Sequence, residues 1–265
     1  MCIIAVKPQG VALPSVEILK RMYNKNPDGA GVAYAINGII TINKGYMNIN
    51  EYIKAVQKIP INATAIIHTR ISTSGGIDKE LTHPYKLTND YKELRQTHAK
   101  MADGYAVAHN GIFGEFGTMQ GANDTMQFIV NYLHPLKELK DKTGGAVIDN
   151  DIKPIINKLV SGSRLVIMDV DGNYMLYGNY WHEQDGIYYS NEGYKQRLDY
   201  STSYYSSKYN TYNKGGYKTL DDDYMDECDG YCDYCKNYYK CAWYKEYAKA
   251  QQQPAPKKIK NTDKK

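Results

Sequence analysis

Two β-rich runs meet at the dipeptide Asn37-Gly38, in the segment AGVAYAINGIITINKG. Asn-Gly between two such runs is a strong signal for a β-hairpin, because both residues tolerate the positive φ angles of a tight two-residue turn. A hairpin commits its two strands to antiparallel pairing. The chain is therefore expected to contain an antiparallel sheet.

Further apolar runs extend this pattern along the chain. Buried strands are indicated by the segments CIIAV, ATAIIHT, YAVAHN, RLVIMDV and GIYYS. Amphipathic or capped helical patterns occur in SVEILKRMYNK, NINEYIKAVQKI and NDTMQFIVNYL. Helices are interspersed among the strands and do not alternate with them strictly. This order predicts an α+β domain with antiparallel sheets, not a doubly wound parallel fold.

Composition divides the chain into four parts. Residues 1–199 predict one globular domain that contains all the strand patterns. Residues 200–227 are rich in Tyr, Ser and Asp and predict a linker, because such a segment has too few aliphatic side chains to build a core. Residues 228–250 form a small Cys-rich module, and residues 251–265 predict a disordered basic tail.

Charge and hydropathy exclude several classes of partner. The formal net charge is +4, and the last fifteen residues supply it with five Lys against one Asp. The body of the chain is therefore close to neutral, so binding to nucleic acid is not expected. No apolar run approaches the ~18 residues of a membrane span, and no signal peptide is recognisable. A cytoplasmic location is expected.

Four of the five cysteines lie close together near the end of the chain, at Cys228, Cys232, Cys235 and Cys241. This C-x3-C-x2-C-x5-C spacing predicts a tetrahedral structural Zn²⁺ site, with unpaired thiols as the alternative. The segment CDGYCDYC also has the CxxxCxxC spacing of radical S-adenosylmethionine enzymes. Those enzymes have a barrel of about domain size after the motif, and the residues after Cys235 are too few for one, so that interpretation is rejected. A non-radical iron–sulfur cluster stays possible as an alternative.

Short polar clusters follow the apolar runs in the first domain: HTRIST, HP, HNG and NDT. Each has a purely structural explanation when taken alone. Arg70 is typical of a surface ion pair, Asn110-Gly111 of a turn and Asp124 of a helix N-cap. Cys2, taken alone, is typical of a small core residue. Their occurrence together, in this order, is more informative than any one of them.

With the segments NPDGAGVAY and AVAHNGI, these clusters resemble the class II glutamine amidotransferase domain, a member of the N-terminal nucleophile (Ntn) hydrolase superfamily. The resemblance covers about residues 1–190. It implies a four-layer αββα sandwich of two antiparallel sheets. It also implies that glutamine is the substrate and that amide hydrolysis requires no cofactor.

The resemblance assigns a role to each matching residue. Cys2 would be the nucleophile after removal of Met1, with its own α-amine as the base. Asn110 and Gly111 would form the oxyanion hole. The residues expected to bind glutamine are Arg70 for the α-carboxylate, Asp124 for the α-ammonium, Thr73 as a nearby contact and His83 in a supporting role.

Two departures from the family pattern bear on function. Ile3 stands where the family usually has glycine, beside the expected nucleophile. No synthetase domain follows the first domain, so a separate ammonia-accepting partner is expected. The alternative is an inactive binding or scaffold protein that acts through the zinc module. The Tyr-, Asn-, Lys- and Ile-rich composition is typical of an AT-rich genome such as that of a phage.

Overall fold

The hairpin expected at Asn37-Gly38 is present. The computed structural model describes residues 1–73, 76–116 and 119–196. Strands β2 (Ala30–Ile36) and β3 (Ile39–Tyr46) pair antiparallel across the two-residue turn. Asn37 and Gly38 have φ angles of 53° and 73°, which is the backbone geometry for which this dipeptide is suited.

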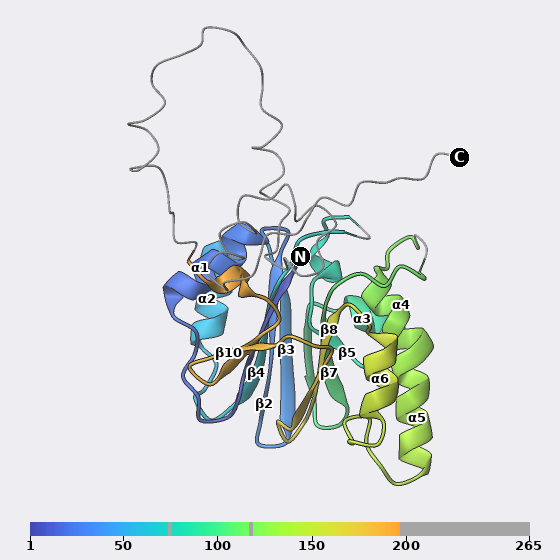
Figure 1. Cartoon of the computed structure of the whole chain (residues 1–265). Helices are drawn as coiled ribbons and strands as arrows, with labels where there is room; N and C mark the ends of the chain where they lie inside the picture. Colours follow the sequence, from blue (N-terminus) through green and yellow to red (C-terminus); the bar gives the residue numbers. More distant parts are fainter. Residues whose placement is uncertain (74–75, 117–118, 197–265) are drawn as a thin grey trace, which may run out of the picture. The chain divides into compact units, whose positions relative to one another are not determined.

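This hairpin belongs to a seven-stranded sheet in which every neighbouring pair is antiparallel. The strands lie in the order β10 (His182–Gln184), β11 (Ile187–Tyr189), β1 (Ile3–Lys7), β4 (Thr64–Thr69), β2, β3 and β6 (His98–Met101). A second, four-stranded antiparallel sheet has the order β5 (Tyr85–Lys86), β7 (Tyr105–Asn110), β8 (Arg164–Asp169) and β9 (Tyr174–Tyr177). The two sheets lie face to face (Figure 1).

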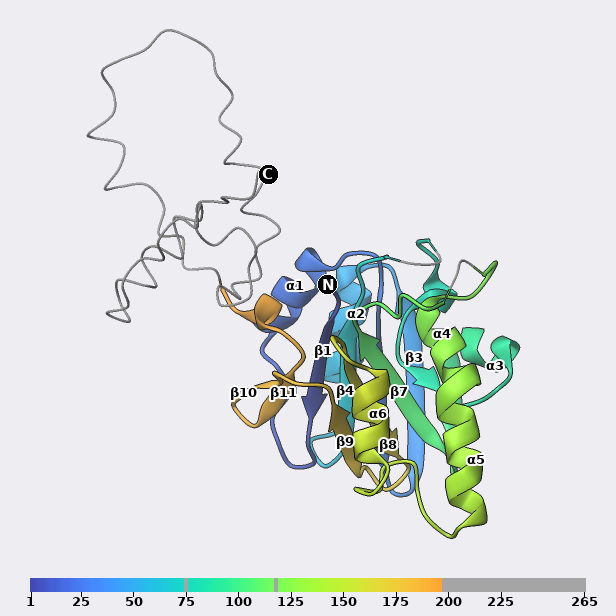
Figure 2. The ribbon, with the colours of Figure 1, turned by 45° about the vertical axis from the view of Figure 1, so that its right-hand side comes forward.

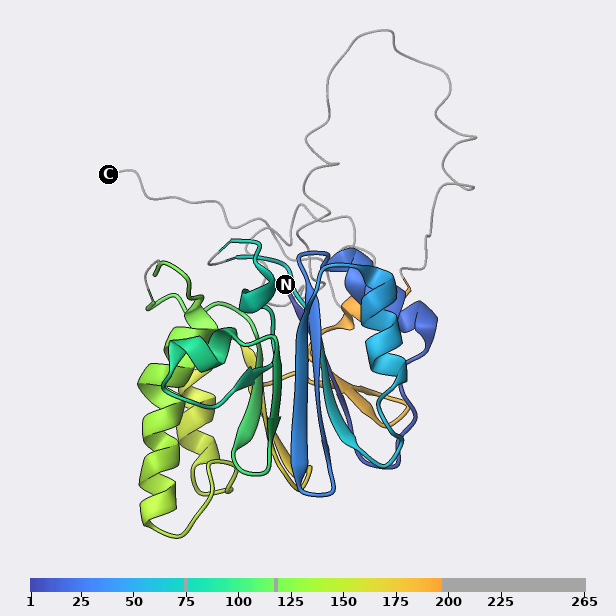
Figure 3. The same cartoon turned by 180° about the vertical axis from the view of Figure 1, so that it is seen from behind.

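Helices cover the outer faces of both sheets (Figures 2 and 3). The seven-stranded sheet carries α1 (Val16–Lys25) and α2 (Ile49–Gln57). The four-stranded sheet carries α4 (Asp124–Phe128), the π-helix η2 (Ile129–Leu133), α5 (His134–Lys142) and α6 (Lys153–Leu159). The short elements are the 3-10 turns η1 (Lys79–Leu81) and η3 (Glu192–Tyr194) and the helix α3 (Tyr91–Arg95).

Strand β1 illustrates how the sequence pattern produces these layers. Its residues are all buried, and their side chains alternate between the two faces of the sheet. Ile3 and Ala5 pack with α1 and α2, whereas Ile4 and Val6 pack against the second sheet. A strand covered on both faces must be apolar throughout, which explains the uninterrupted run IIAV.

The structure confirms an α+β fold with two antiparallel sheets, and its layers are compatible with a sandwich. Strands β5, β6 and β10 and helices α3, α5 and α6 were not expected, because each is short or lacks a clear periodicity. In the part of the chain that the structure describes, no helix combines the length and the apolar character needed to cross a membrane. The linker 200–227, the module 228–250 and the tail 251–265 lie outside the described residues.

Candidate active site

Cys2 lies directly before strand β1, at the same end of the sheet as Arg70. Strands β1 and β4 pair with Ile3 opposite Thr69, which brings the residue before β1 beside the residue after β4. The Cys2 thiol lies 3.5 Å from the carbonyl oxygen of Ile71. Cys2 is partly exposed, in contrast to the fully buried residues that follow it in β1.

One small pocket contains six of the seven residues to which the sequence assigned a catalytic or substrate-binding role. Its lining includes Cys2, Arg70, Thr73, His83, Gly111 and Asp124. These residues come from the start of β1, the segments after β4 and η1, the end of β7 and the start of α4. The seventh, Asn110, is fully buried at the end of β7 and does not line the pocket.

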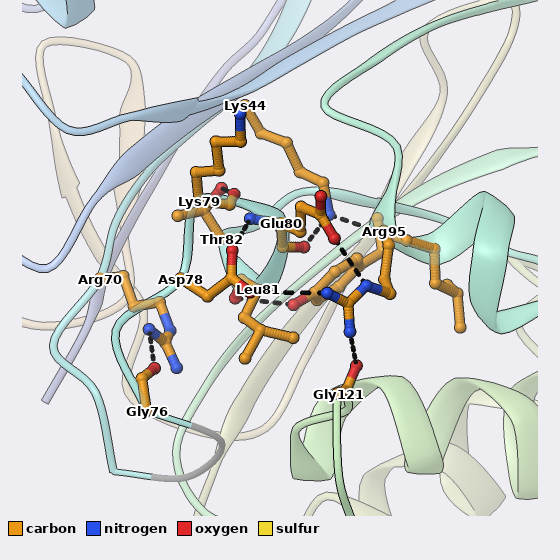
Figure 4. A network of polar contacts seen from close by, with 12 residues as sticks. Lys44, Arg70, Gly76, Asp78, Lys79, Glu80, Leu81, Thr82, Arg95 and Gly121 are labelled. Atoms are coloured by element: carbon orange, nitrogen blue, oxygen red, sulfur yellow. Dashed lines mark hydrogen bonds and ion pairs between the residues drawn. The ribbon is translucent and has the colours of Figure 1, made fainter.

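Arg70 is held in place from both its backbone and its side chain. Its N–H donates to the Gly29 carbonyl over 2.8 Å, and its own carbonyl accepts from the Asp28 N–H. The guanidinium Nη1 donates to the Gly76 carbonyl over 2.8 Å (Figure 4). The Asp28 carboxylate accepts from the Ser72 N–H. The loop that contains Asp28 therefore fixes the segment after β4, a role that the sequence reasoning did not assign to it.

Asp124 is the first residue of helix α4, and the N-cap is Asn123 instead. The Asn123 side chain accepts from the Met126 N–H, so the purely structural explanation of Asp124 as the cap is wrong. The Asp124 carboxylate accepts from the Phe113 N–H over 2.9 Å and from the Thr125 N–H over 2.8 Å. These bonds tie the start of α4 to the loop after Gly111 and hold the carboxylate beside the pocket.

Gly111 has a conformation and surroundings that require glycine. Its φ is +154°, and a Cβ at this position would collide with the side chain of Ser163. Its neighbour Asn110 has its Nδ2 2.9 Å from the Ser190 hydroxyl, while its Oδ1 is buried and has no hydrogen-bond partner in the part of the chain that the structure describes. The Asn-Gly pair is therefore in close contact with two serines: Gly111 packs against Ser163, and the Asn110 side chain contacts Ser190.

Three histidines lie buried near the pocket. Burial lowers the pKa of His68 and of His109 to about 3, and it lowers the pKa of His83 well below the usual range. The rings of His68 and His83 lie 4.4 Å apart between centroids, and neither ring nitrogen of His83 has a hydrogen-bond partner among the described residues. The three rings are therefore neutral at pH 7, so none of them adds positive charge to the site.

The Cys2 thiol is surrounded by protein atoms although the residue as a whole is partly exposed. This burial raises the pKa of the thiol above its usual value. The hydrogen bond to Ile71, the positive N-terminus and Arg70 act in the opposite direction and offset only part of the increase. At neutral pH the thiol stays protonated, so nucleophilic attack would require a base.

Two neighbouring residues near the end of the described domain hold the N-terminal strand, and the sequence reasoning missed both. The Asn191 Nδ2 donates to the Cys2 carbonyl over 2.7 Å. The Ser190 hydroxyl accepts from the Ile4 N–H over 2.9 Å. The available signal was the pair Ser-Asn directly after a β-rich run, at the position where a strand ends.

The predicted zinc ligands Cys228, Cys232, Cys235 and Cys241 lie outside the described residues. Within the described ranges, no group of three or more His, Cys, Asp or Glu side chains is arranged to hold a metal ion. The C-terminal zinc site stays a prediction. Metal analysis of the purified full chain would test it.

Two curated proteins are significantly similar to this chain, and no protein-family model matches it. The chain is 28% identical over 184 residues to the glutamine–fructose-6-phosphate aminotransferase (isomerizing) of Buchnera aphidicola, covering 64% of this chain and 27% of that protein. It is 31% identical over 116 residues to the enzyme of the same name from Agrobacterium fabrum, covering 43% and 17%. The chain thus spans about a quarter or less of the length of the curated relatives it matches.

Proposed function

We propose that this chain is a class II glutamine amidotransferase domain with an Ntn hydrolase fold, and that it hydrolyses the side-chain amide of glutamine at Cys2. The observation that carries the proposal is the single pocket that joins Cys2, Arg70, Gly111 and Asp124. A nucleophile and two side chains of opposite charge are the groups that a free amino acid amide requires. The two relatives, whose names include glutamine, support this substrate.

The mechanism requires removal of Met1, which is 52% exposed and thus accessible to an aminopeptidase. The free α-amine of Cys2 then takes the proton of the thiol, and the sulfur attacks the amide carbon of glutamine. The tetrahedral intermediate collapses as the amine passes the proton to the leaving nitrogen, which releases ammonia and leaves a thioester. Water attacks the thioester and releases glutamate.

The negative oxygen of the tetrahedral intermediate would be stabilised at the end of β7. The proposed donors are the side-chain amide of Asn110 and the backbone N–H of Gly111. Loss of one such donor typically costs about 2.7–4 kcal/mol of barrier. The Gly111 backbone lies close against Ser163, so a side chain at position 111 would displace the proposed backbone donor.

Arg70 and Asp124 would bind the two charges on the α-carbon of glutamine, with Thr73 as an exposed contact at the pocket. His83 would line the pocket as a neutral ring and have a supporting role. Ammonia transfer to a separate synthetase is part of the proposal. The competing hypothesis of an inactive scaffold predicts no glutamate from glutamine. Glutamate and ammonia assays on wild-type protein and on the Cys2→Ala variant therefore decide between the two.

The Arg70→Ala variant is expected to lower kcat/KM for glutamine at least about tenfold, which corresponds to ~1.4 kcal/mol. The planar guanidinium fork matches a carboxylate, and alanine leaves the substrate carboxylate without its counter-charge. Steady-state kinetics with glutamine measures the effect. Arg70→Lys is the matched variant, because it keeps the charge and loses the fork. Unchanged kinetics in folded Arg70→Ala protein would contradict the assignment.

Arg95 joins the segment of Glu80 to the segment of Gly121, as Figure 4 shows. Its Nε donates to the Glu80 carboxylate over 2.6 Å, and its Nη1 donates to the Gly121 carbonyl over 2.8 Å. Gly121 lies three residues before Asp124, so Arg95 joins the η1 segment to the loop that leads into helix α4. A lysine lacks the planar fork, so its single nitrogen cannot take the positions of both the Nε and the Nη1 that make these two contacts.

The Arg95→Lys variant is therefore expected to raise KM for glutamine roughly tenfold and to change kcat by less than about twofold. The reason is that Asp124 would be less firmly positioned, while Cys2 and the oxyanion donors are unaffected. Steady-state kinetics separates the two parameters. A fall in kcat at constant KM would indicate that Arg95 acts on the reaction step and not on substrate binding.

A further inference from the structure

Ser190 joins the strand that carries the nucleophile to the strand that carries the oxyanion donor. It is fully buried and directly follows strand β11. Its backbone N–H donates to the Ile4 carbonyl over 2.9 Å, and its hydroxyl accepts from the Ile4 N–H over the same distance. The same hydroxyl lies 2.9 Å from the Asn110 side-chain amide. Ile4 is two residues from Cys2, so one hydroxyl contacts both the strand that follows the nucleophile and the side chain of the proposed oxyanion donor.

The Ser190 hydroxyl has two donors beside it and, among the described residues, no acceptor for its own hydrogen when the Asn110 Nδ2 faces it. In that orientation both neighbours point a hydrogen at the Ser190 oxygen, and within the described residues the hydroxyl's own hydrogen has no acceptor. The Asn110 Oδ1 is at the same time buried without a hydrogen-bond partner among those residues. Buried polar groups of this kind are normally paired.

A half-turn of the Asn110 amide gives the hydroxyl hydrogen an acceptor and the Oδ1 a donor, and it makes the Nδ2 the unpaired end of the amide. The Ser190 hydroxyl then accepts from Ile4 and donates to the Asn110 Oδ1, which satisfies all three groups. The two ends of an amide have nearly the same shape, so the hydrogen-bond partners decide its orientation. After the half-turn, the Nδ2 group takes the buried position that has no hydrogen-bond partner among the described residues.

We propose that Ser190 is a positioning residue that holds the Asn110 amide by its oxygen and thereby keeps the NH2 group free for the oxyanion of the tetrahedral intermediate. The inference rests on the proposed glutamine hydrolysis. Because the hydroxyl is also bonded to Ile4, it links the position of the oxyanion donor to that of Cys2. Ser190 itself touches neither the substrate nor the thiol in this assignment.

The Ser190→Ala variant tests the proposal, because it removes the hydroxyl and keeps the backbone bond to Ile4. We expect kcat for glutamine to fall at least about tenfold, as for partial loss of one oxyanion donor, with KM within about twofold of wild type. Ser190→Thr retains the hydroxyl and should restore most of kcat. Thr64→Ala is the matched control, because it removes a buried hydroxyl at the far end of β4.

A double-mutant cycle with Asn110→Ala separates positioning from a general loss of stability. If Ser190 acts through Asn110, the Ser190→Ala change should alter kcat by less than about twofold in the Asn110→Ala background. Independent, multiplying effects would overturn the proposal, as would wild-type kcat in folded Ser190→Ala protein. Thermal melts verify folding, and Ser190→Cys replaces the alanine variant if the latter does not fold. Inactive wild-type protein would instead overturn the proposed function, and this inference with it.

Discussion

Protein that begins at Cys2 is expected to release ammonia and glutamate from glutamine, whereas protein with an uncleavable N-terminal extension is expected to be folded and inactive. An extension converts the α-amine of Cys2 into an amide, which cannot accept the thiol proton. The loss should be large, at least roughly a thousandfold, because nucleophile and base then fail together. The raised pKa of the Cys2 thiol makes this base indispensable at neutral pH.

Mass spectrometry of the intact protein establishes which form is present, and a C-terminal tag leaves the N-terminus free. The glutamine-mimicking electrophile 6-diazo-5-oxo-norleucine should label Cys2 in the active form only. Full activity with Met1 retained would contradict the mechanism. Labelling at one of the C-terminal cysteines instead of Cys2 would contradict it equally.

The same base determines the sign of the pH dependence. An α-amine has a reference pKa of ~7.7–8.0, and only its neutral form can take a proton. The rate should therefore rise as the pH increases from 6, reach half of its maximum at about pH 8 and level off above about pH 9. A rate that is constant across this range would indicate that the thiol is already ionised without the amine.

The second large effect is expected on stability in acid. His68 and His109 have pKa values of about 3 in the folded protein, against about 6.5 for an unfolded chain. Between these values the unfolded state binds more protons, so stability is complete above pH 6.5 and is lost as the pH falls toward 3. From pH 7.5 to 5.5 the unfolded state gains nearly one proton per ring relative to the folded state, so each of the two rings should cost on the order of 1 kcal/mol.

Urea denaturation at the two pH values measures this loss. In the His68→Asn variant the difference between pH 7.5 and 5.5 should shrink by on the order of 1 kcal/mol, even if the variant is less stable at both. His98→Gln removes a solvent-exposed histidine and should retain the wild-type difference. An unaltered difference in folded His68→Asn protein would show that His68 is not the group that is protonated on unfolding.

Local sequence patterns were sufficient for elements whose signals lie within a few residues. The Asn37-Gly38 turn, the helical pattern of α1 and the apolar runs of β1 and β4 are examples. Each depends on turn chemistry, capping or side-chain periodicity, which act over one or two turns of chain. The two-residue strand β5 has no such signal and forms because it pairs with β7.

The sequence by itself determined which chemical groups this protein possesses: a thiol at position 2, a guanidinium at Arg70, an Asn-Gly pair at 110–111 and a carboxylate at Asp124. The tertiary structure alone decided that these groups line or adjoin one pocket, because only the pairing of β1 with β4 and the packing of one sheet on the other bring the ends of distant strands together. It also decided the supporting contacts of Ser190, Asn191 and Arg95, which join segments as far as 189 residues apart. Contacts over such separations depend on the folded arrangement of the strands, and no local pattern encodes them.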